Sequence, residues 1–287
     1  MSDIKDILKP LLYEYKDKFE VVIPEDYEKQ KLMYNSLVSV RAPGLSDSVN
    51  EDFFRLQDDY LTKEIKKQGI VNCDSLLSVY EEYNIEPKKV DVEAMMKVGE
   101  TFKFCHSDKI CLYMGDIALL DADMIVDSTD SKMLGCFIPN HNCLDNHIHL
   151  LSGTRLREEC YGVVKSAKRG LRCGEARVTK AYNLPAKYIA HTFGPSIDDV
   201  ITDQAERELT SCCQACLDEA EKLRLKTVAF PLISTGESNY PLVEASKVIL
   251  QAIDEYLDQA ECVDKVVIVA HDEEAYDAVL FSIKHSL

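Results

Sequence analysis

The segment TVAFPLISTGESNYPLVEASKVILQAIDEY, residues 227–256, indicates the fold class. It begins with an apolar run over residues 227–233, continues through a loop of small polar residues, and ends in a pattern with helical spacing over residues 243–256. A short apolar run bounded by turn residues is typical of a buried strand. Strand, polar loop and helix in this order predict one unit of an α/β fold with a parallel sheet.

The same alternation of strand and helix patterns extends from about residue 102 to the end of the chain. The other apolar runs that predict strands are residues 110–114, 124–126, 176–179, 188–192 and 266–270. The other patterns that predict helices are residues 144–160, 204–223 and 275–285. We therefore expect a largely parallel sheet with helices on both faces. In such sheets, ligands bind beyond the carboxyl ends of the strands.

Residues 1–101 differ from the rest of the chain because they are rich in charge and show helical patterns. Apolar residues at helical spacing predict a first helix near residues 4–12, and further helices are expected at residues 27–40, 50–67 and 73–83. We expect residues 1–101 to form a helical N-terminal extension that packs on a domain formed by residues 102–287. The alternative is that these helices form an independent module that binds a partner protein.

Composition and charge exclude several classes of function. The chain of 287 residues has 50 acidic and 33 basic residues, which give a net charge of −17. Nucleic-acid surfaces need Lys and Arg to neutralise phosphates, so we expect no nucleic-acid partner. No apolar run reaches the length of a membrane span, so no membrane partner is expected either. Eleven cysteines without a signal peptide predict free thiols and a cytoplasmic location.

The segment GCFIPNHNCLDNHIH, residues 135–149, concentrates residues that bind metals. Cys136, His141 and Cys143 offer two thiols and an imidazole within eight residues, and this donor set suits zinc. Three ligands without a local fourth are the arrangement of a zinc site that keeps one coordination position open. Two other interpretations remain at this point: a structural zinc whose fourth ligand is distant in sequence, and a loop that binds no metal.

Two further polar loops follow predicted strands. Residues 234–241 are small and polar and precede a helix, which favours a cradle of backbone N–H groups for phosphate; a plain turn is the alternative. Asp116 follows the strand predicted at residues 110–114, where its carboxylate could accept hydrogen bonds from an exocyclic amine such as that of adenine. The alternative role for Asp116 is to cap the next turn. The chain contains neither a Walker loop nor a Rossmann fingerprint.

The remaining cysteines and histidines are interpreted as structural. Cys212, Cys213 and Cys216 lie in a strongly helical segment, where thiols that pack as small apolar side chains explain them better than a metal site does. His149 is expected to be a core or helix-start residue and not a ligand of the metal, and His191 is expected to be a structural residue within a strand.

Together these motifs resemble the macrodomain family, whose fold binds ADP-ribose. The resemblance rests on Gly115–Ile117, Ala122–Ser131, Gly135–His149, Gly174–Thr179, Tyr182–Tyr188, His191–Pro195 and Phe230–Gly236. Most macrodomains carry a glycine-rich loop where this chain has Cys136–Cys143. The replacement is similar to that of the zinc-containing macrodomains, whose members also carry a helical N-terminal extension. The resemblance implies a three-layer α/β/α fold with a mixed, mostly parallel central sheet.

The resemblance also implies a hydrolase that binds ADP-ribose, uses Zn²⁺ and removes mono-ADP-ribose from a modified protein. Cys136, His141 and Cys143 would hold the metal. The residues implied to bind ADP-ribose are Asp116 and Ile117 at the adenine, Leu144, Asp145 and Asn146 along the diphosphate and distal ribose, Asp130 at the distal ribose, Ser234, Thr235, Gly236 and Glu237 in the phosphate cradle, and Asn239 and Tyr240 closing it. Asp145 is the candidate base or positioning group, Glu237 is the second carboxylate, and Asp130 completes the candidate catalytic set.

The chain departs from the macrodomain pattern at two positions. The family's Asn-Ala-Ala-Asn-Ser is here Asp127–Ser131, which places Asp130 where the second Asn approaches the distal ribose. Ser238 replaces an aromatic residue expected after Glu237. Both changes fall where the reaction would occur, so the alternative function is a catalytically weak or inactive ADP-ribose reader. A third hypothesis is a structural zinc domain whose N-terminal helices act as an interaction module.

Overall fold

The computed structural model describes residues 4–17, 22–44, 46, 48–85 and 105–285. Its centre is a six-stranded sheet with the order β1-β6-β5-β2-β4-β3. The strands are β1 (Ile110–Met114), β2 (Met124–Ser128), β3 (Ala176–Lys180), β4 (Tyr188–Thr192), β5 (Thr227–Pro231) and β6 (Lys265–Ala270). All neighbouring strands run parallel except β3 and β4, which are antiparallel. The predicted mixed, mostly parallel sheet is therefore confirmed.

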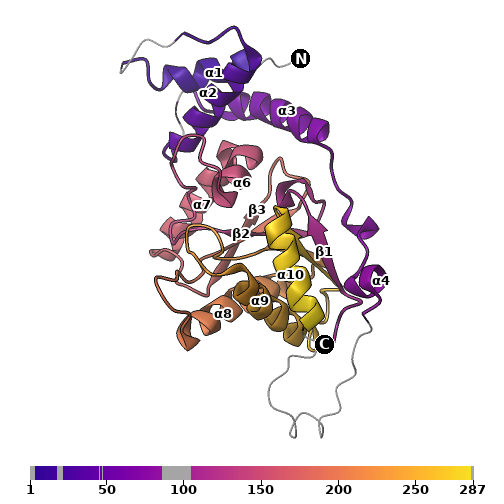
Figure 1. The fold of residues 1–287 in the computed structure, drawn as a ribbon. Helices are drawn as coiled ribbons and strands as arrows, with labels where there is room; N and C mark the ends of the chain where they lie inside the picture. The colour runs from indigo at the N-terminus through magenta and orange to yellow at the C-terminus, as the bar shows by residue number, and fades with distance from the viewer. Residues whose placement is uncertain (1–3, 18–21, 45, 47, 86–104, 286–287) are drawn as a thin grey trace, which may run out of the picture.

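Helices cover both faces of the sheet. Successive side chains of each strand point to opposite faces, so one strand can contribute to two apolar clusters. On β2, Met124 and Val126 pack into one apolar cluster, and Ile125 between them packs into the other. The first cluster is closed by α8 (Asp203–Lys222), α9 (Leu242–Leu257) and α10 (Glu273–His285), and the second by α6 (Leu144–Ser152) and α7 (Thr154–Ala167). Figure 1 shows α8, α9 and α10 side by side along one face of the sheet. The expected three layers are present.

The single helix predicted over residues 144–160 is divided into α6 and α7 at Gly153. Gly153 has φ +90°, a conformation that residues with a Cβ rarely adopt. A Cβ at this position would also lie 2.8 Å from Gln57 Oε1. Gln57 Oε1 accepts hydrogen bonds from both the backbone N–H and the hydroxyl of Thr154, so a residue of the N-terminal helices caps the first turn of α7. The pattern of apolar residues continues through this break, which is why spacing alone predicted one helix.

The N-terminal residues form helices, as predicted, within the part that the structure describes. These are α1 (Ile4–Tyr13), α2 (Tyr27–Val40), α3 (Glu51–Gln68), a 3-10 turn at Cys73–Ser75 and α4 (Val79–Tyr83). The first three helices share an apolar core of their own, and Leu150 of α6 packs against it. Figure 1 shows α1, α2 and α3 lying above α6 and α7. The predicted domain boundary between residues 101 and 102 lies outside the described residues.

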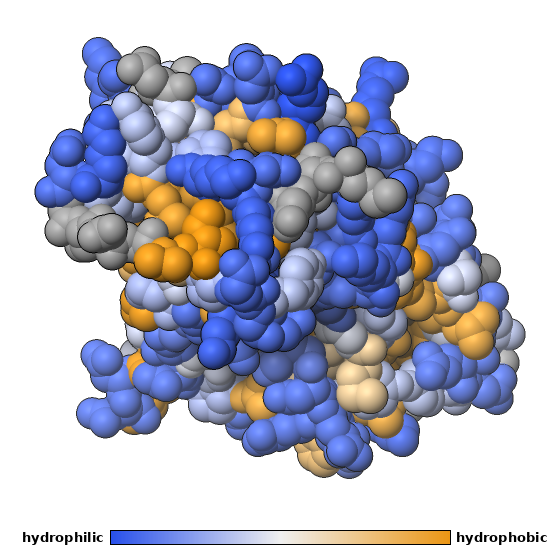
Figure 2. All heavy atoms as spheres, turned by 90° about the horizontal axis from the view of Figure 1, so that it is seen from above, coloured by the Kyte–Doolittle hydropathy of each residue, from blue (hydrophilic) through white to orange (hydrophobic). Residues whose placement is uncertain are grey.

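The face shown in Figure 2 is mostly hydrophilic, with several separate groups of hydrophobic residues. None of the described helices combines the length and the apolar character needed to cross a membrane. All eleven cysteines are free thiols, and Cys212, Cys213 and Cys216 are fully buried in α8, in agreement with their interpretation as core residues.

Candidate functional site

Three polar loops meet at one edge of the sheet because β1, β2 and β5 are aligned in the same direction and end there. The loop after β1 carries Asp116, the long connection after β2 carries residues 129–143, and the loop after β5 carries residues 232–241. This is the edge at which parallel α/β sheets bind ligands.

The structure brings the three predicted metal ligands together. Donor atoms of Cys136, His141 and Cys143 all lie within 4.8 Å of one another, and the three side chains are partly buried. The loop that carries them turns sharply, with positive φ at Gly135 (80°), Phe137 (55°) and Asn140 (54°). Positive φ at Phe137 and Asn140 is unfavourable for residues with a Cβ, so contacts with the rest of the molecule must hold the loop in this shape.

The environments of His141 and Cys143 suit a bound cation. His141 Nδ1 is buried and has no hydrogen-bond partner among the residues that the structure describes, whereas Nε2 lies 3.2 Å from Glu237 Oε1. Cys143 Sγ accepts a hydrogen bond of 3.4 Å from Asn146 N at the start of α6. Burial raises the pKa of Cys143 to about 12, and neighbouring Cys136 contributes to this rise. Two thiols and an imidazole with an unused nitrogen are a donor set that zinc fits.

The loop after β5 makes a tight turn beside this cluster. Ser234 and Asn239 have positive φ, and Tyr240 N donates a 3.0 Å hydrogen bond to Ser234 O. A Cβ on Gly194 would lie 2.2 Å from Ser234 Oγ, so only glycine at position 194 allows this close approach. Ser234 Oγ is buried, and no described residue forms a hydrogen bond with it. Of the residues expected in the phosphate cradle, Gly236 and Glu237 are exposed and Thr235 is half-buried.

The two residues expected to close the cradle are placed differently from each other. Asn239 is exposed, whereas Tyr240 is 1 % exposed and packs in the apolar core beneath the loop. Ser238, at the position of the missing aromatic residue, is half-buried, and its carbonyl accepts a hydrogen bond of 2.8 Å from Ile197 N. Tyr240 therefore supports the cradle from below.

Asp116 caps the turn that follows β1, which was the alternative role considered for it. Its Oδ1 accepts a hydrogen bond of 2.9 Å from Ala118 N, and its Oδ2 lies 2.7 Å from His147 Nε2. Burial opposes ionisation of Asp116, but the interactions with His147 and Ala118 outweigh it and lower the pKa of the carboxyl. Asp116 is therefore an ionised acceptor at the edge of the site, and His147 is its present partner. Ile117 beside it is buried.

Asp145, the candidate base, lies inside the molecule and not on its open side. It is 7 % exposed, and its Oδ1 lies 3.4 Å from His149 Nε2. Burial and the neighbouring Asp127 raise the pKa of Asp145 well above its ordinary value. Burial also raises the pKa of Asp127 to about 7. Two adjacent carboxyl groups of this kind share a proton, since both cannot be ionised in a closed interior.

Asp127 and Asp145 belong to a buried polar network beneath the cysteine loop. His191 Nδ1 lies 2.9 Å from Asp127 Oδ2, and Thr179 Oγ1 lies 2.9 Å from His191 Nε2. Burial lowers the pKa of His191 to about 4, so the ring is neutral and hydrogen-bonds through Nδ1 with Asp127 and through Nε2 with Thr179. Donor atoms of Asp127, Asp145 and His149 lie within 4.8 Å of one another, but all three residues are buried.

Two other predicted site residues, Asp130 and Asn146, form hydrogen bonds with neighbouring groups of the chain. Asp130 is exposed, and its Oδ1 accepts hydrogen bonds from the backbone N–H groups of Lys132 (2.7 Å) and Met133 (3.1 Å). Asn146 is fully buried, and its amide contacts Ser39 and the carbonyl of His141. The side chain of Asn146 therefore holds the cysteine loop through the carbonyl of His141. Leu144, at the start of α6, is half-buried.

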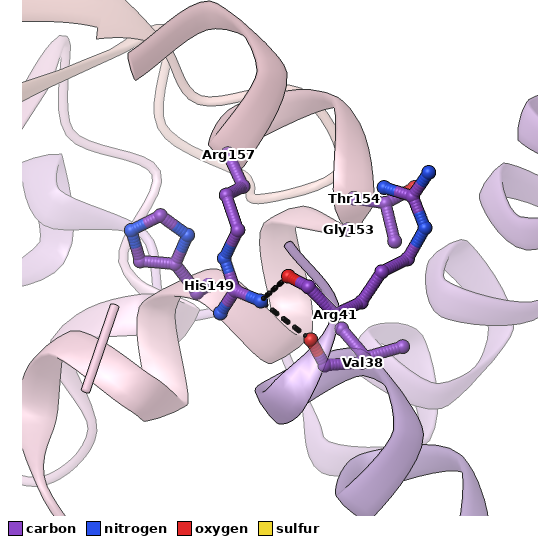
Figure 3. A pocket seen from close by; sticks show the side chains of 6 residues that line it. All are labelled: Val38, Arg41, His149, Gly153, Thr154 and Arg157. Carbon is purple, nitrogen blue, oxygen red and sulfur yellow. Dashed lines mark hydrogen bonds between the residues drawn. The ribbon is translucent and has the colours of Figure 1, made fainter. Parts of the chain in front are cut away.

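Sequence patterns did not identify Arg157 or Ser39 as part of this region. Arg157 Nη1 donates to the carbonyls of Val38, Ser39 and Arg41, and the guanidinium lies 4.6 Å from the ring of Phe137 in the cysteine loop. Figure 3 shows Arg157 between His149 and the end of α2, beside a cavity of about 10 Å³. These contacts join residues more than a hundred positions apart, and neither residue belongs to a recognisable motif.

Comparison with known proteins identifies the family. The model of the Macro domain family matches residues 126–249. A protein-ADP-ribose hydrolase of Treponema medium is 31% identical over 261 residues, which cover 91% of this chain and 90% of the relative. A protein-ADP-ribose hydrolase of Staphylococcus aureus strain MRSA252 is 30% identical over 262 residues, covering 91% of this chain and 87% of the relative.

Solved structures agree with this match. The Oceanobacillus iheyensis macrodomain with ADP has a TM-score of 0.55 at 28% identity, and the match covers 61% of this chain and 90% of that one. The Trypanosoma brucei macrodomain in complex with ADP has a TM-score of 0.59 at 23% identity, covering 88% of this chain and 96% of its own, and supports the fold alone. The chain belongs to the macro domain family, as the sheet, the loops at its carboxyl edge and these relatives together show.

Proposed function

We propose that the protein is a zinc-dependent hydrolase that binds ADP-ribose and removes mono-ADP-ribose from modified proteins. The relatives named protein-ADP-ribose hydrolase match 91% of this chain. The observation that carries the proposal is the meeting of two loops: donor atoms of Cys136, His141 and Cys143 converge, and His141 lies 3.2 Å from Glu237 of the predicted phosphate cradle.

Zinc would be held by Cys136, His141 and Cys143. The fit is supported by the soft, converging donor atoms and by the buried Nδ1 of His141, which has no partner within the described part of the chain, since a buried polar atom without a partner is costly. When bound, zinc supplies Lewis-acid chemistry to such a site. The rest of the proposed reaction concerns the carboxylates and backbone of the chain itself.

Glu237 is proposed as the carboxylate that accepts a proton, because it is exposed on the open side of the site beside His141. Asp145 lies inside the molecule, where it is 7 % exposed and where burial and the neighbouring Asp127 raise the pKa of its carboxyl. We therefore assign Asp145 to the support of the cysteine loop from below. Cleavage at the anomeric carbon passes through a state with oxocarbenium character, and a nearby carboxylate stabilises that positive charge and can take a proton from the attacking water.

The remaining edge of the site would bind the ADP part. Residues 234–237 would receive the diphosphate through backbone N–H groups, followed by the positive end of α9. Asp116 is an ionised acceptor, and an adenine amine would take the place that His147 Nε2 now occupies at 2.7 Å. Leu144, which is half-buried, and Asn239, which is exposed, would line the sides of the ADP-ribose site.

The alternative function is an ADP-ribose reader that turns over slowly or not at all. It is favoured by Asp130, an exposed carboxylate that only accepts hydrogen bonds when ionised, at a position where an amide would be expected. Ser238 removes an aromatic wall at the same end of the site. Asp130 and Ser238 are expected to affect catalysis more than ADP-ribose binding, because neither lies at the predicted adenine end of the site.

The test combines binding and turnover on the same protein. ADP-ribose binding is measured by calorimetry, and release from a mono-ADP-ribosylated protein is measured with and without a zinc chelator. We expect binding together with release that the chelator suppresses. His141→Ala should lose release by about a hundredfold or more while ADP-ribose binding persists, as expected for loss of a metal ligand. His285→Ala, an exposed histidine at the end of α10, is the matched control and should behave as wild type.

The outcomes separate the hypotheses. Binding without release supports the reader. Release that is unaffected by chelation refutes the zinc requirement but leaves the hydrolase. Absence of both binding and release refutes both ligand functions and leaves a structural zinc domain as the remaining hypothesis.

A further inference from the structure

A chain of hydrogen bonds runs from helix α2 to the backbone of a predicted metal ligand. The hydroxyl of Ser39 donates to Asn146 Oδ1 at 3.0 Å, and Asn146 Nδ2 donates to the carbonyl of His141 at 2.8 Å. The backbone N–H of Asn146 donates to Cys143 Sγ at 3.4 Å. Asn146 thus contacts two of the three predicted ligands, and Ser39 holds the side-chain amide that makes one of these contacts. Both Ser39 and Asn146 are fully buried.

Arg157 fixes the end of α2 from which Ser39 projects. Its Nη1 donates to the carbonyls of Val38 at 2.7 Å, Ser39 at 3.0 Å and Arg41 at 2.7 Å. The last carbonyls of a helix have no partners within the helix and form its negative end, so a guanidinium is well suited to this position. The contacts with Val38 and Arg41 can be followed in Figure 3. The same guanidinium lies over the ring of Phe137, so it also touches the cysteine loop.

Arg41, the residue after α2, forms ion pairs with Glu158 of α7 and with Glu14. Arg41 Nη1 lies 2.8 Å from Glu158 Oε1 and Arg41 Nε lies 3.0 Å from Glu14 Oε2, and the Arg41 side chain is 5 % exposed. Charge-assisted hydrogen bonds of this kind fix geometry more strongly than neutral ones. The position of Ser39 relative to Asn146 is therefore set from both sides, by Arg157 and by Arg41.

We propose that Ser39 is a positioning residue for the metal site, through which the N-terminal helices hold the cysteine loop in the shape that binds zinc. This inference rests on the zinc site of the proposed function. The loop has positive φ at Phe137 and Asn140, so it needs contacts from outside to keep its conformation. Without the Ser39 hydroxyl, Asn146 Oδ1 would be buried and unpaired, and the amide would reorient and release the His141 carbonyl.

The experiment measures zinc affinity in the full-length protein by competition with a chromogenic chelator. Ser39→Ala is expected to weaken zinc binding by about tenfold, the lower end of the range for residues that orient metal ligands. The matched control is Ser246→Ala, which removes another buried serine hydroxyl, one that donates to Leu242 O within α9. This control should keep the zinc affinity of the wild type. Urea unfolding of both variants shows whether their losses of stability are comparable.

A second measurement does not depend on metal. Hydrogen exchange of residues 135–143 in the zinc-free protein should be faster in Ser39→Ala than in wild type and in Ser246→Ala. If wild type binds zinc and Ser39→Ala binds it equally tightly, the positioning role is refuted while the zinc site stands. If wild type binds no zinc, the zinc part of the proposed function fails, and unchanged exchange of the loop in Ser39→Ala would then refute the positioning role as well.

Discussion

Replacing Asp127 by asparagine should flatten the dependence of stability on pH. Asp127 is fully buried, and burial raises its pKa from the ordinary 3.8 to about 7. A raised carboxyl pKa means that the folded state holds the proton more tightly than the unfolded state does. The stability due to this proton is fully present below about pH 4 and is lost as the pH rises through 7.

The size of the effect follows from the shift. A difference of about 3 pKa units at 1.36 kcal/mol per unit corresponds to roughly 4 kcal/mol in total, of which roughly 3 kcal/mol is lost between pH 5 and pH 8. In Asp127→Asn the hydrogen bond with His191 Nδ1 can be kept, because the amide offers both an acceptor and a donor in place of the carboxyl. The free energy of unfolding of wild type should therefore fall over this range by roughly 3 kcal/mol more than that of the variant.

The assay is urea unfolding followed by circular dichroism at several pH values. Zinc affinity depends on pH through its thiol ligands, so wild type and variant are compared at the same zinc concentration and only their difference is used. Asp199→Asn, which changes an exposed aspartate, is the control and should follow wild type. Parallel pH curves for wild type and Asp127→Asn would refute the shared, buried proton.

Three further changes test other parts of the structure. Leu8→Ala removes a fully buried side chain from the core of α1–α3 and should cost about 2–5 kcal/mol in urea unfolding, whereas a loss below about 1 kcal/mol would mean that this core contributes little. Gly153→Ala places a Cβ at φ +90° and 2.8 Å from Gln57 Oε1, so it should destabilise by about 1–3 kcal/mol in the same assay; an unchanged midpoint would contradict the strain. Asp130→Asn keeps the acceptor for Lys132 N and adds a donor, and should raise the rate of ADP-ribose release about tenfold if that donor reaches the distal ribose; an equal rate would show that the carboxylate does not limit release, and a lower rate would show that it is required.

Much of the fold could be predicted from the sequence because its central strands are buried on both faces. Runs such as residues 227–231 and 265–270 are apolar with little interruption, and such runs between helical patterns leave few alternatives to a parallel sheet. The division of one predicted helix at Gly153 could not be foreseen, because the apolar pattern is continuous there. Its cause is Gln57, which caps α7 from a distant part of the chain.

The candidate site was predictable where its residues are close in sequence. Cys136, His141 and Cys143 lie within eight positions, so their types and spacing were enough to predict that they converge. The orientation of Asp145 and Asn146 was not predictable, since the first turn of a helix presents side chains both to the loop and to the core. Packing decides between these directions, and it turns both side chains inward here.

Helices α2 and α3 contact α6 and α7, and these contacts have two consequences for engineering. They limit the truncation of the chain to its macrodomain, and they limit the transfer of the cysteine loop to other proteins. A shortened protein without residues 1–85 would lose the carbonyls that Arg157 binds, the cap that Gln57 provides for Thr154, and the cover over Leu150. The Nη1 group of Arg157 and the apolar surface around Leu150 would then face water. Likewise, moving residues 135–143 into a macrodomain that lacks such helices would carry over the thiols and the imidazole without the groups that shape the loop around them.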